Sequence, residues 1–194
     1  MVLWESCAYL VDDERRRRVY NRLLAETGAD PARIAGMRTV ALAALIEADG
    51  GMQPMLRADK LQRAANLTLD VGRAELARLC RKEPIKARRT LRKFPGIGDP
   101  GADKILMVSG SLRTLGLESN GLRVLRRLGF GKASADYTKT YRSVSADVAD
   151  ELPRTTAGLI EAHQLLRQHG KTLCKAAAPL CGKCRLAARC PSAM

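Results

Sequence analysis

Residues 174–191 read Cys174-Lys-Ala-Ala-Ala-Pro-Leu-Cys181-Gly-Lys-Cys184-Arg-Leu-Ala-Ala-Arg-Cys190-Pro191 and contain four of the six cysteines of the chain. Six, two and five residues separate these cysteines in turn. Thiols gathered this closely in a chain without a secretion signal are typical of metal ligands rather than of disulfide partners. Gly182 lies between the second and third cysteines, so one tight turn aims both sulfurs at the same site.

The spacing also bears on which metal these cysteines hold. Zinc sites usually show two short ligand pairs some distance apart, whereas here three unequal gaps lie within 17 residues and no histidine joins them. Pro191 follows the last cysteine, as it does in iron–sulfur runs. The pattern favours a [4Fe–4S] cluster, with zinc and then disulfides as the alternatives. The predicted ligands are Cys174, Cys181, Cys184 and Cys190.

Composition predicts a folded, strongly basic protein. The 194 residues are 46% hydrophobic, and 34 Lys and Arg against 20 Asp and Glu give a net charge of +14. Such a charge attracts polyanions, which favours nucleic acid as a partner over a merely basic surface. No apolar run reaches the length of a membrane span, and the N-terminus lacks an apolar signal core. We therefore expect no membrane association and a reducing compartment, most simply a cytoplasm, with the protein at the nucleoid.

The hydrophobic pattern is helical almost throughout, which predicts an all-α fold. Gly129 to Gly131 break the pattern and mark the expected boundary between two domains, 5–128 and 129–194. The cysteine stretch is expected to be a compact loop. The predicted helices are 5–26, 38–48, 58–71, 73–82, 85–93, 102–114, 120–128, 134–151 and 155–169, with another beginning at Pro31 after an Asp30 cap.

A glycine-rich turn, Phe94-Pro95-Gly96-Ile97-Gly98, lies between two of these helices. Gly96 and Gly98 allow backbone N–H groups to approach an anion, and the N-terminus of the next helix adds partial positive charge. Ile97 is expected to point inward. The pattern indicates a helix–hairpin–helix that binds one DNA phosphate. It lacks the Gly-Lys-Ser/Thr of a nucleotide loop and the strand of a dinucleotide fingerprint, and a simple helix connection is the remaining alternative.

Basic residues crowd the helix before this turn: Arg81, Lys82, Lys86, Arg88, Arg89, Arg92 and Lys93. The hairpin, an acidic residue some twenty positions later and the cysteine spacing together resemble the endonuclease III branch of the helix–hairpin–helix DNA glycosylases. The resemblance covers about residues 5 to 190. It implies two helical domains with duplex DNA bound between them, and a mainly structural [4Fe–4S] cluster. It also implies backbone contacts from Lys175, Lys183, Arg185 and Arg189, although simple surface charge is the alternative for each.

We therefore expect phosphate contacts from Gly96, Ile97, Gly98, Lys93, Lys183 and Arg185. The catalytic positions depart from the family pattern. Bifunctional relatives carry a lysine two residues after the second hairpin glycine, and that lysine forms a Schiff base with the sugar. Pro100 occupies this position. Lys104 lies one helical turn further on and is a second, weaker candidate. Monofunctional relatives also lack the lysine and use water.

The family's essential aspartate begins the next helix, and here the matching segment is Leu117-Glu118-Ser119-Asn120-Gly121. The resemblance places Glu118 in the aspartate's position, where a carboxylate stabilises an oxocarbenium-like sugar and orients water. Glu118 is one methylene longer, and a misplacement of about 1 Å costs on the order of a hundredfold in rate. Alternatively, Glu118 only decorates the helix start, with Ser119 or Asn120 as the cap.

Two functions follow from these residues. The first is a base-excision N-glycosylase, monofunctional and monomeric, that acts with water on a damaged or mispaired base. The second is a catalytically inactive module that recognises distorted duplex. The resemblance places duplex-wedging residues around Tyr9, Leu10 and Val11, for which a core role is the alternative. His163 and His169 are expected to be solvated, and Cys7 and Cys80 to be buried thiols.

Overall fold

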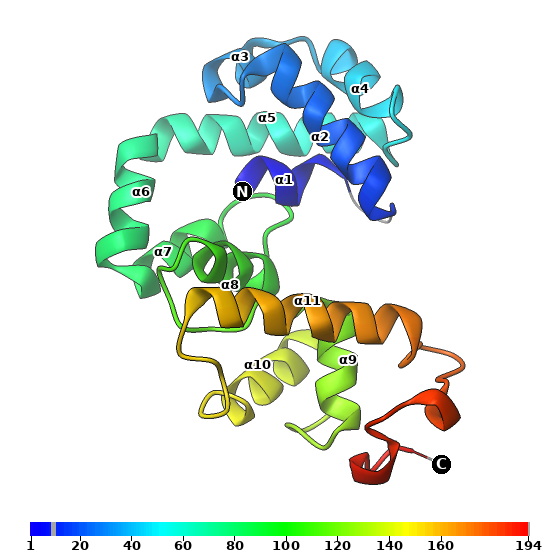
Figure 1. Ribbon diagram of the computed structural model, residues 1–194. Helices are drawn as coiled ribbons and strands as arrows, with labels where there is room; N and C mark the ends of the chain where they lie inside the picture. The colour runs from blue at the N-terminus through cyan, green and yellow to red at the C-terminus, as the bar shows by residue number, and fades with distance from the viewer. Residues whose placement is uncertain (9–10, 194) are drawn as a thin grey trace. The chain divides into compact units, whose positions relative to one another are not determined.

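The computed structural model describes residues 1–8 and 11–193 (Figure 1). The described residues form α-helices joined by turns, which confirms the predicted all-α class. The chain divides into two compact units, Met1–Gly98 and Asp99–Met194. The wedge candidates Tyr9 and Leu10 lie outside the described residues. No helix in the described part of the chain is both long and apolar enough to cross a bilayer.

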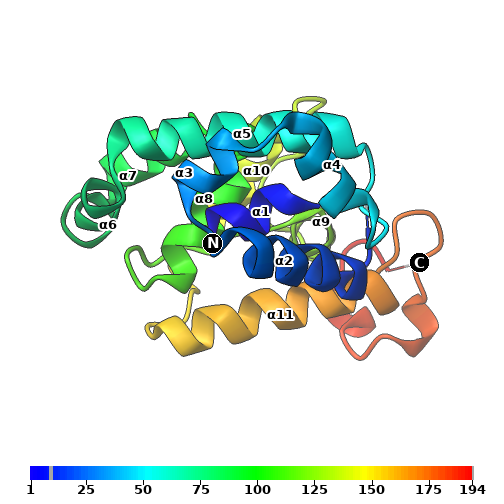
Figure 2. The same ribbon diagram turned by 90° about the horizontal axis from the view of Figure 1, so that it is seen from above.

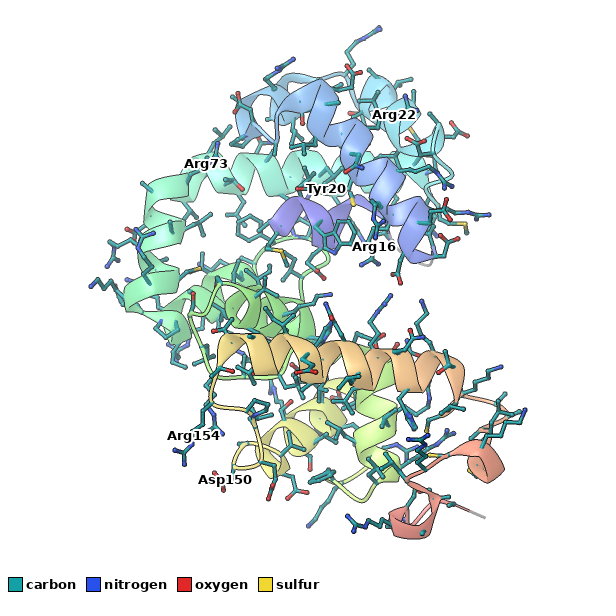
Figure 3. The ribbon with its side chains drawn as sticks, in the orientation of Figure 1. Arg16, Tyr20, Arg22, Arg73, Asp150 and Arg154 are labelled. Carbon is teal, nitrogen blue, oxygen red and sulfur yellow. The ribbon has the colours of Figure 1, made fainter. Side chains whose placement is uncertain are left out.

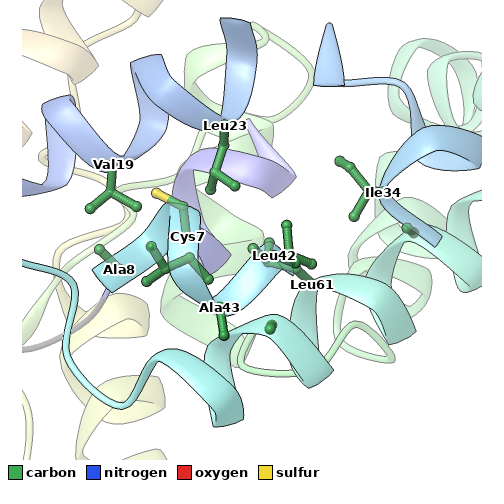
Figure 4. Close-up of a cluster of buried hydrophobic side chains, with 11 residues drawn as sticks. Cys7, Ala8, Val19, Leu23, Ile34, Leu42, Ala43 and Leu61 are labelled. Carbon is green, nitrogen blue, oxygen red and sulfur yellow. The ribbon is translucent and has the colours of Figure 1, made fainter. Parts of the chain in front are cut away.

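The first unit is built around one long helix, α5 (Pro54–Val71). Helices α1 (Val2–Cys7), α3 (Pro31–Gly36) and α4 (Thr39–Glu47) contact α5, while α2 (Asp13–Thr27) contacts α1 and α4 (Figure 1). The chain then continues through α6 (Arg73–Lys82) and α7 (Pro84–Leu91). The buried core between these helices includes Val19, Leu23, Leu42 and Leu61 (Figure 4).

Cys7 lies in the middle of this core and is fully buried. Burial raises the pKa of its thiol to about 11, because desolvation disfavours the thiolate. Cys80 is half-buried, and burial likewise raises the pKa of its thiol. Both thiols therefore lie among packed side chains, as their apolar neighbours in the sequence predict.

The single helix predicted over residues 5–26 is wrong, because two helices occupy this range. Ala8 is extended, with φ −150° and ψ 143°, and ends α1. Asp12 then caps α2, its carboxylate accepting a hydrogen bond from the Arg15 N–H at 2.8 Å. The predicted C-terminal end of this helical stretch, at Thr27-Gly28, is confirmed, since Gly28 adopts the left-handed conformation with φ 63° after the last residue of α2.

Two basic side chains of α2, Arg16 and Arg22, contact side chains outside this helix (Figure 3). The Tyr20 ring packs edge-on against Trp4 with centroids 5.3 Å apart, and the Arg16 guanidinium lies 5.8 Å from the Trp4 centroid. Arg22 forms an ion pair with Asp49. These contacts fix α2 against α1 and against the end of α4.

The second unit contains α8 (Asp99–Val108), α9 (Ser119–Arg127), α10 (Tyr137–Asp147) and α11 (Thr156–Thr172). Helix α11 contacts both α8 and α9, and α10 contacts α9 (Figures 1 and 2). The cysteine stretch follows the end of α11 and contains two short 3-10 turns, Cys181–Lys183 and Ala187–Arg189. The buried core of the second unit includes Leu117, Leu122, Tyr141 and Val144.

The predicted domain boundary after residue 128 falls inside this second unit rather than between the two. The Gly129–Gly131 break is a turn at the start of the connection, residues 128–136, between α9 and α10. Gly131 has φ 66°, and a Cβ there would lie 2.6 Å from the Val144 backbone nitrogen. The glycines thus allow a close helix connection, and the composition shift marks this turn rather than a linker.

Candidate functional site

The glycine-rich turn has the form that its sequence predicts. The Phe94 N–H donates to the Leu91 carbonyl at 3.1 Å, and the Ile97 N–H donates to the Phe94 carbonyl at 3.0 Å. Phe94 and Ile97 are buried, which confirms the inward plug, while Gly96 and Gly98 are exposed. Gly96 has φ 84° and open space where a Cβ would stand. The turn therefore presents exposed backbone immediately before the first residue of α8.

The expected basic contributors to phosphate binding are accessible. Lys93 lies next to the hairpin and is exposed. Lys183 and Arg185 are exposed on or beside the first 3-10 turn of the cysteine stretch. Lys175 and Arg189 are also exposed. These exposed side chains are accessible to a phosphate, and their contacts with DNA stay a prediction.

Helix α8 carries the altered family position. Pro100 is its second residue and offers no nucleophile, and Lys104 follows one turn later and is half-buried. Two buried acids fix the helix. Asp99 Oδ2 accepts from Arg142 Nε at 3.0 Å, and Asp103 Oδ2 accepts from the Tyr141 hydroxyl at 2.8 Å. Both partners lie on α10, so α8 has a defined rotation in this unit.

Glu118 is the N-cap of α9, in place of the expected Ser119 or Asn120. Its Oε1 accepts from the Gly121 N–H at 2.8 Å, and its Oε2 accepts from Asn120 Nδ2 at 2.7 Å. Capping and a site role are therefore compatible, because the hydrogen bonds fix a half-buried carboxylate at the positive end of a helix.

A chain of hydrogen bonds runs from this carboxylate to the cysteine stretch. Asn120 Oδ1 accepts from Arg123 Nη2 at 2.8 Å. Arg123 also donates to the Gly170 carbonyl at 2.8 Å and, through Nε, to the Cys174 carbonyl at 2.9 Å. The start of α9, the end of α11 and the first cysteine are thus connected within one unit. No motif in the sequence predicts this role of Arg123.

The segment that carries Glu118 packs directly on α8. A Cβ at Gly116 would lie 2.4 Å from the Lys104 Cα and 2.5 Å from its nitrogen. Only a glycine allows this approach, since the atoms in the way belong to the backbone. Lys104 and Glu118 therefore occupy neighbouring parts of the same unit.

Replacing Gly116 with alanine is expected to lower the free energy of unfolding by about 1–3 kcal/mol, because the backbone of α8 must shift. Denaturant unfolding measures this change. Gly36→Ala is the matched control, since a Cβ there meets no atom within 4 Å. Equal stabilities for the two variants would contradict the close approach.

His163 is not simply solvated, contrary to the prediction. It lies half-buried on α11. Desolvation, and then the nearby positive charge of Lys104, lower the pKa of its imidazole below 6.5. Both influences favour the neutral form of the imidazole. Sequence spacing alone could not show that α11 turns this residue toward α8 and Glu118.

The four cysteines of the C-terminal stretch line the wall of one pocket, and all are half-buried free thiols. Val124, Leu128 and Leu173 supply apolar parts of that wall. Among residues 1–8 and 11–193, no group of three His, Cys, Asp or Glu side chains is arranged to hold a metal ion. The predicted ligands thus surround a shared space without converging on one point.

Polar groups near these sulfurs fit an anionic, sulfur-ligated centre. Arg127 Nη1 donates to Cys174 Sγ at 3.3 Å, and His169 Nε2 lies 3.6 Å from Cys184 Sγ. Arg127 also donates to the carbonyls of Lys175 and Ala176. Hydrogen bonds to sulfur are a normal part of iron–sulfur sites. The donor set therefore suits a [4Fe–4S] cluster.

Comparisons with known proteins place these features in context. No protein-family model matches the chain. Over 99 residues, 51% of its length, the chain is 32% identical to endonuclease III of Sulfolobus acidocaldarius. The match covers 42% of that relative, so the chain spans less than half the length of the curated relatives it matches.

Solved structures show the likeness over nearly the whole chain. A trapped endonuclease III–DNA covalent intermediate superposes with a TM-score of 0.76 and 20% identity, covering 99% of this chain and 82% of the other. A thermostable thymine-DNA glycosylase gives a TM-score of 0.71 and 15% identity over 98% of this chain and 82% of the other. The chain is thus endonuclease III-like in sequence and has the helix–hairpin–helix DNA glycosylase fold.

Proposed function

We propose that this endonuclease III-like chain is a DNA base-excision N-glycosylase that uses water and forms no Schiff base with the sugar. The observation that carries the proposal is the Glu118 carboxylate, half-buried and held by two hydrogen bonds at the start of α9. Pro100 supports the monofunctional chemistry, because it lacks the amine that a lyase needs. The structural similarity to an endonuclease III–DNA covalent intermediate and to a thymine-DNA glycosylase supports the class of reaction.

The reaction proceeds through a sugar that gains positive charge as its bond to the base breaks. The electrons of the N-glycosidic bond leave with the base, which takes up a proton. A water oxygen then bonds to C1′ and releases its own proton. The fixed negative charge of Glu118 stabilises the cationic sugar and orients the water. The product is an abasic site with an intact backbone.

Duplex binding in this proposal begins at the hairpin. The exposed backbone of Gly96 and Gly98 and the start of α8 bind one phosphate, and Ile97 holds the turn in shape. Lys93, Lys183 and Arg185 add phosphate contacts. These contacts position the DNA without reading its sequence.

Replacing Lys93 with glutamine is expected to weaken DNA binding similarly for all sequences. The slope of log Kd against log salt should fall by about 1, because one fewer counterion is released. Fluorescence anisotropy across a salt series measures both effects. Arg78→Gln is the control, since Glu75 and Glu83 already engage this guanidinium. A slope unchanged by Lys93→Gln would remove this residue from the interface.

The proposed cofactor is a [4Fe–4S] cluster held by Cys174, Cys181, Cys184 and Cys190. When bound, it would supply four metal–sulfur bonds that tie the chain end to itself. Arg127 would contribute a hydrogen bond to the first sulfur. The loop residues Lys183 and Arg185 would then be fixed in place beside their ligating neighbours.

The test of the proposed function is a panel of duplexes that carry single damaged or mispaired bases. Purified holoprotein should produce abasic sites, seen as strand breaks only after heat and alkali. Borohydride should trap no covalent adduct, with the wild type or with Lys104→Gln. Absence of abasic sites on every lesion would refute the glycosylase, and an adduct lost in Lys104→Gln would show a lyase.

A second candidate function is a module that binds distorted duplex without cleaving it. The hydrogen-bonded cap favours it, since both Glu118 oxygens already accept a bond and the side chain is longer than aspartate. The double variant Glu118→Asp with Pro100→Lys separates the two functions. If the wild type is silent and the double variant cleaves, the binding module is correct.

A further inference from the structure

We propose that Arg127 is a positioning residue for the centre that the four cysteines hold, and that its guanidinium raises the reduction potential of that centre. The inference rests on the cofactor in the proposed function and adds a redox property to it. Arg127 is the last residue of α9 and lines the same pocket as the four predicted ligands. It is half-buried there, whereas its neighbour Arg126 is exposed.

The side chain of Arg127 contacts both a ligand sulfur and the backbone that follows it. Its Nη1 donates to Cys174 Sγ at 3.3 Å and to the Lys175 carbonyl at 2.7 Å, and its Nη2 donates to the Ala176 carbonyl at 3.0 Å. A planar guanidinium presents its donors in a fixed fork, which suits several acceptors at once. The two carbonyl bonds therefore hold the guanidinium in the orientation that reaches the sulfur.

The last cysteine also lies against Arg127. The Cys190 thiol donates to the Arg127 backbone carbonyl at 3.3 Å. A ligating cysteine gives up that proton, so this contact is lost when the sulfur binds a metal. An N–H donor, by contrast, can bond to a thiolate as well as to a thiol. The guanidinium bond to Cys174 is therefore the sulfur contact of Arg127 that metal binding allows.

The charge of this guanidinium faces the sulfurs without a carboxylate to offset it. Within residues 1–8 and 11–193, Arg127 forms no ion pair with an Asp or Glu side chain. Val124, Leu128 and Leu173 supply apolar wall to the same pocket. Apolar surroundings lower the local dielectric and strengthen electrostatic interactions across the pocket.

The expected consequence is a higher reduction potential. When a [4Fe–4S] cluster is bound, one-electron reduction adds a negative charge beside Cys174. Hydrogen bonds to the sulfurs are among the factors that set the reduction potential of such clusters. A positive donor stabilises the more negative, reduced form. Removing the guanidinium should therefore make reduction harder while the four iron ligands stay in the chain.

The experiment compares holoprotein of the wild type with the variants Arg127→Gln, Arg127→Lys and Arg126→Gln. Glutamine removes the charge, whereas lysine keeps it but lacks the planar fork. Arg126→Gln is the matched control, because it removes one positive charge from an exposed position in the last turn of the same helix. Dithionite supplies the electron, and electron paramagnetic resonance measures the reduced cluster at each poised potential. Loss of visible absorbance in the presence of a chelator measures iron retention.

We expect the largest redox effect in Arg127→Gln. At the potential where the wild-type cluster is half reduced, its ratio of reduced to oxidised cluster should be about tenfold lower, which is a potential about 59 mV lower for a one-electron couple. Arg127→Lys should stay within about threefold of the wild-type ratio, yet both Arg127 variants should lose iron to the chelator about tenfold faster. Arg126→Gln should match the wild type in both measurements.

Equal potentials for Arg127→Gln and Arg126→Gln would overturn the proposal, and so would wild-type iron retention in both Arg127 variants. If Arg127→Gln holds no iron, Arg127→Lys decides the matter, and a rate of iron loss equal to that of Arg126→Gln would overturn the proposal. A wild type that holds zinc or no metal refutes the proposed cofactor, and this inference with it. A wild-type cluster that Arg127→Gln leaves unchanged refutes this inference alone.

Discussion

Replacing Glu118 with glutamine is expected to lower the single-turnover rate of base excision by about 10²–10⁴-fold. The amide oxygen can still accept the Gly121 N–H, so the cap of α9 is largely kept, although the amide nitrogen cannot accept the bond from Asn120 Nδ2. What is lost is the negative charge that faces a cationic sugar. DNA affinity and the free energy of unfolding should therefore change little, and the abasic product is quantified directly.

Asp136→Asn is the control for this variant. Asp136 caps α10, its carboxylate accepting from the Thr138 and Lys139 N–H groups at 2.7 and 3.2 Å. The substitution makes the same chemical change at the same kind of position on another helix. If both variants keep the wild-type rate, Glu118 is only a cap and the binding module is the better description.

Replacing Cys181 with serine is expected to remove the bound iron and to lower the free energy of unfolding by about 4–5 kcal/mol or more. The reason is that residues 174–193 are short turns with few buried side chains of their own. Wild-type protein should contain about four iron and four sulfide per chain, and the variant far less. Iron analysis, visible absorption and denaturant unfolding measure these effects.

Cys80→Ser is the matched control, since this half-buried thiol lies on α6 in the other unit. It should keep full iron content. Limited proteolysis adds a local readout, because the variant Cys181→Ser should be cut within residues 174–193 while the control is protected. If the wild-type protein contains one zinc and no iron, the four cysteines bind zinc rather than a [4Fe–4S] cluster.

Local patterns predicted much of the fold. The pairing of Asp30 with Pro31, the glycine at the end of α2 and the buried Ile97 of the hairpin all follow from short-range backbone chemistry. The cysteine spacing likewise predicted one shared site, and the four thiols line one pocket. Each of these features depends on residues close together in the chain.

Features that depend on distant contacts could not be predicted in the same way. The Asp12 cap competes with a helical pattern that continues through residues 5–26, and only tertiary packing of α1 decides the outcome. The turn at Gly129–Gly131 looks like a linker until α10 packs on it. His163 faces Lys104 because α11 crosses α8, a relation that helical periodicity does not contain.

The buried thiol at Cys7 has a consequence for loading the protein with iron in a test tube. Iron is captured by thiolates, and a thiol with a pKa of about 11 is ionised in only about one molecule in ten thousand at pH 7. Ferrous salts and sulfide should therefore spare Cys7, and so should iodoacetamide. Reconstitution needs no prior removal of this cysteine, and alkylation of the folded apoprotein should leave it unmodified.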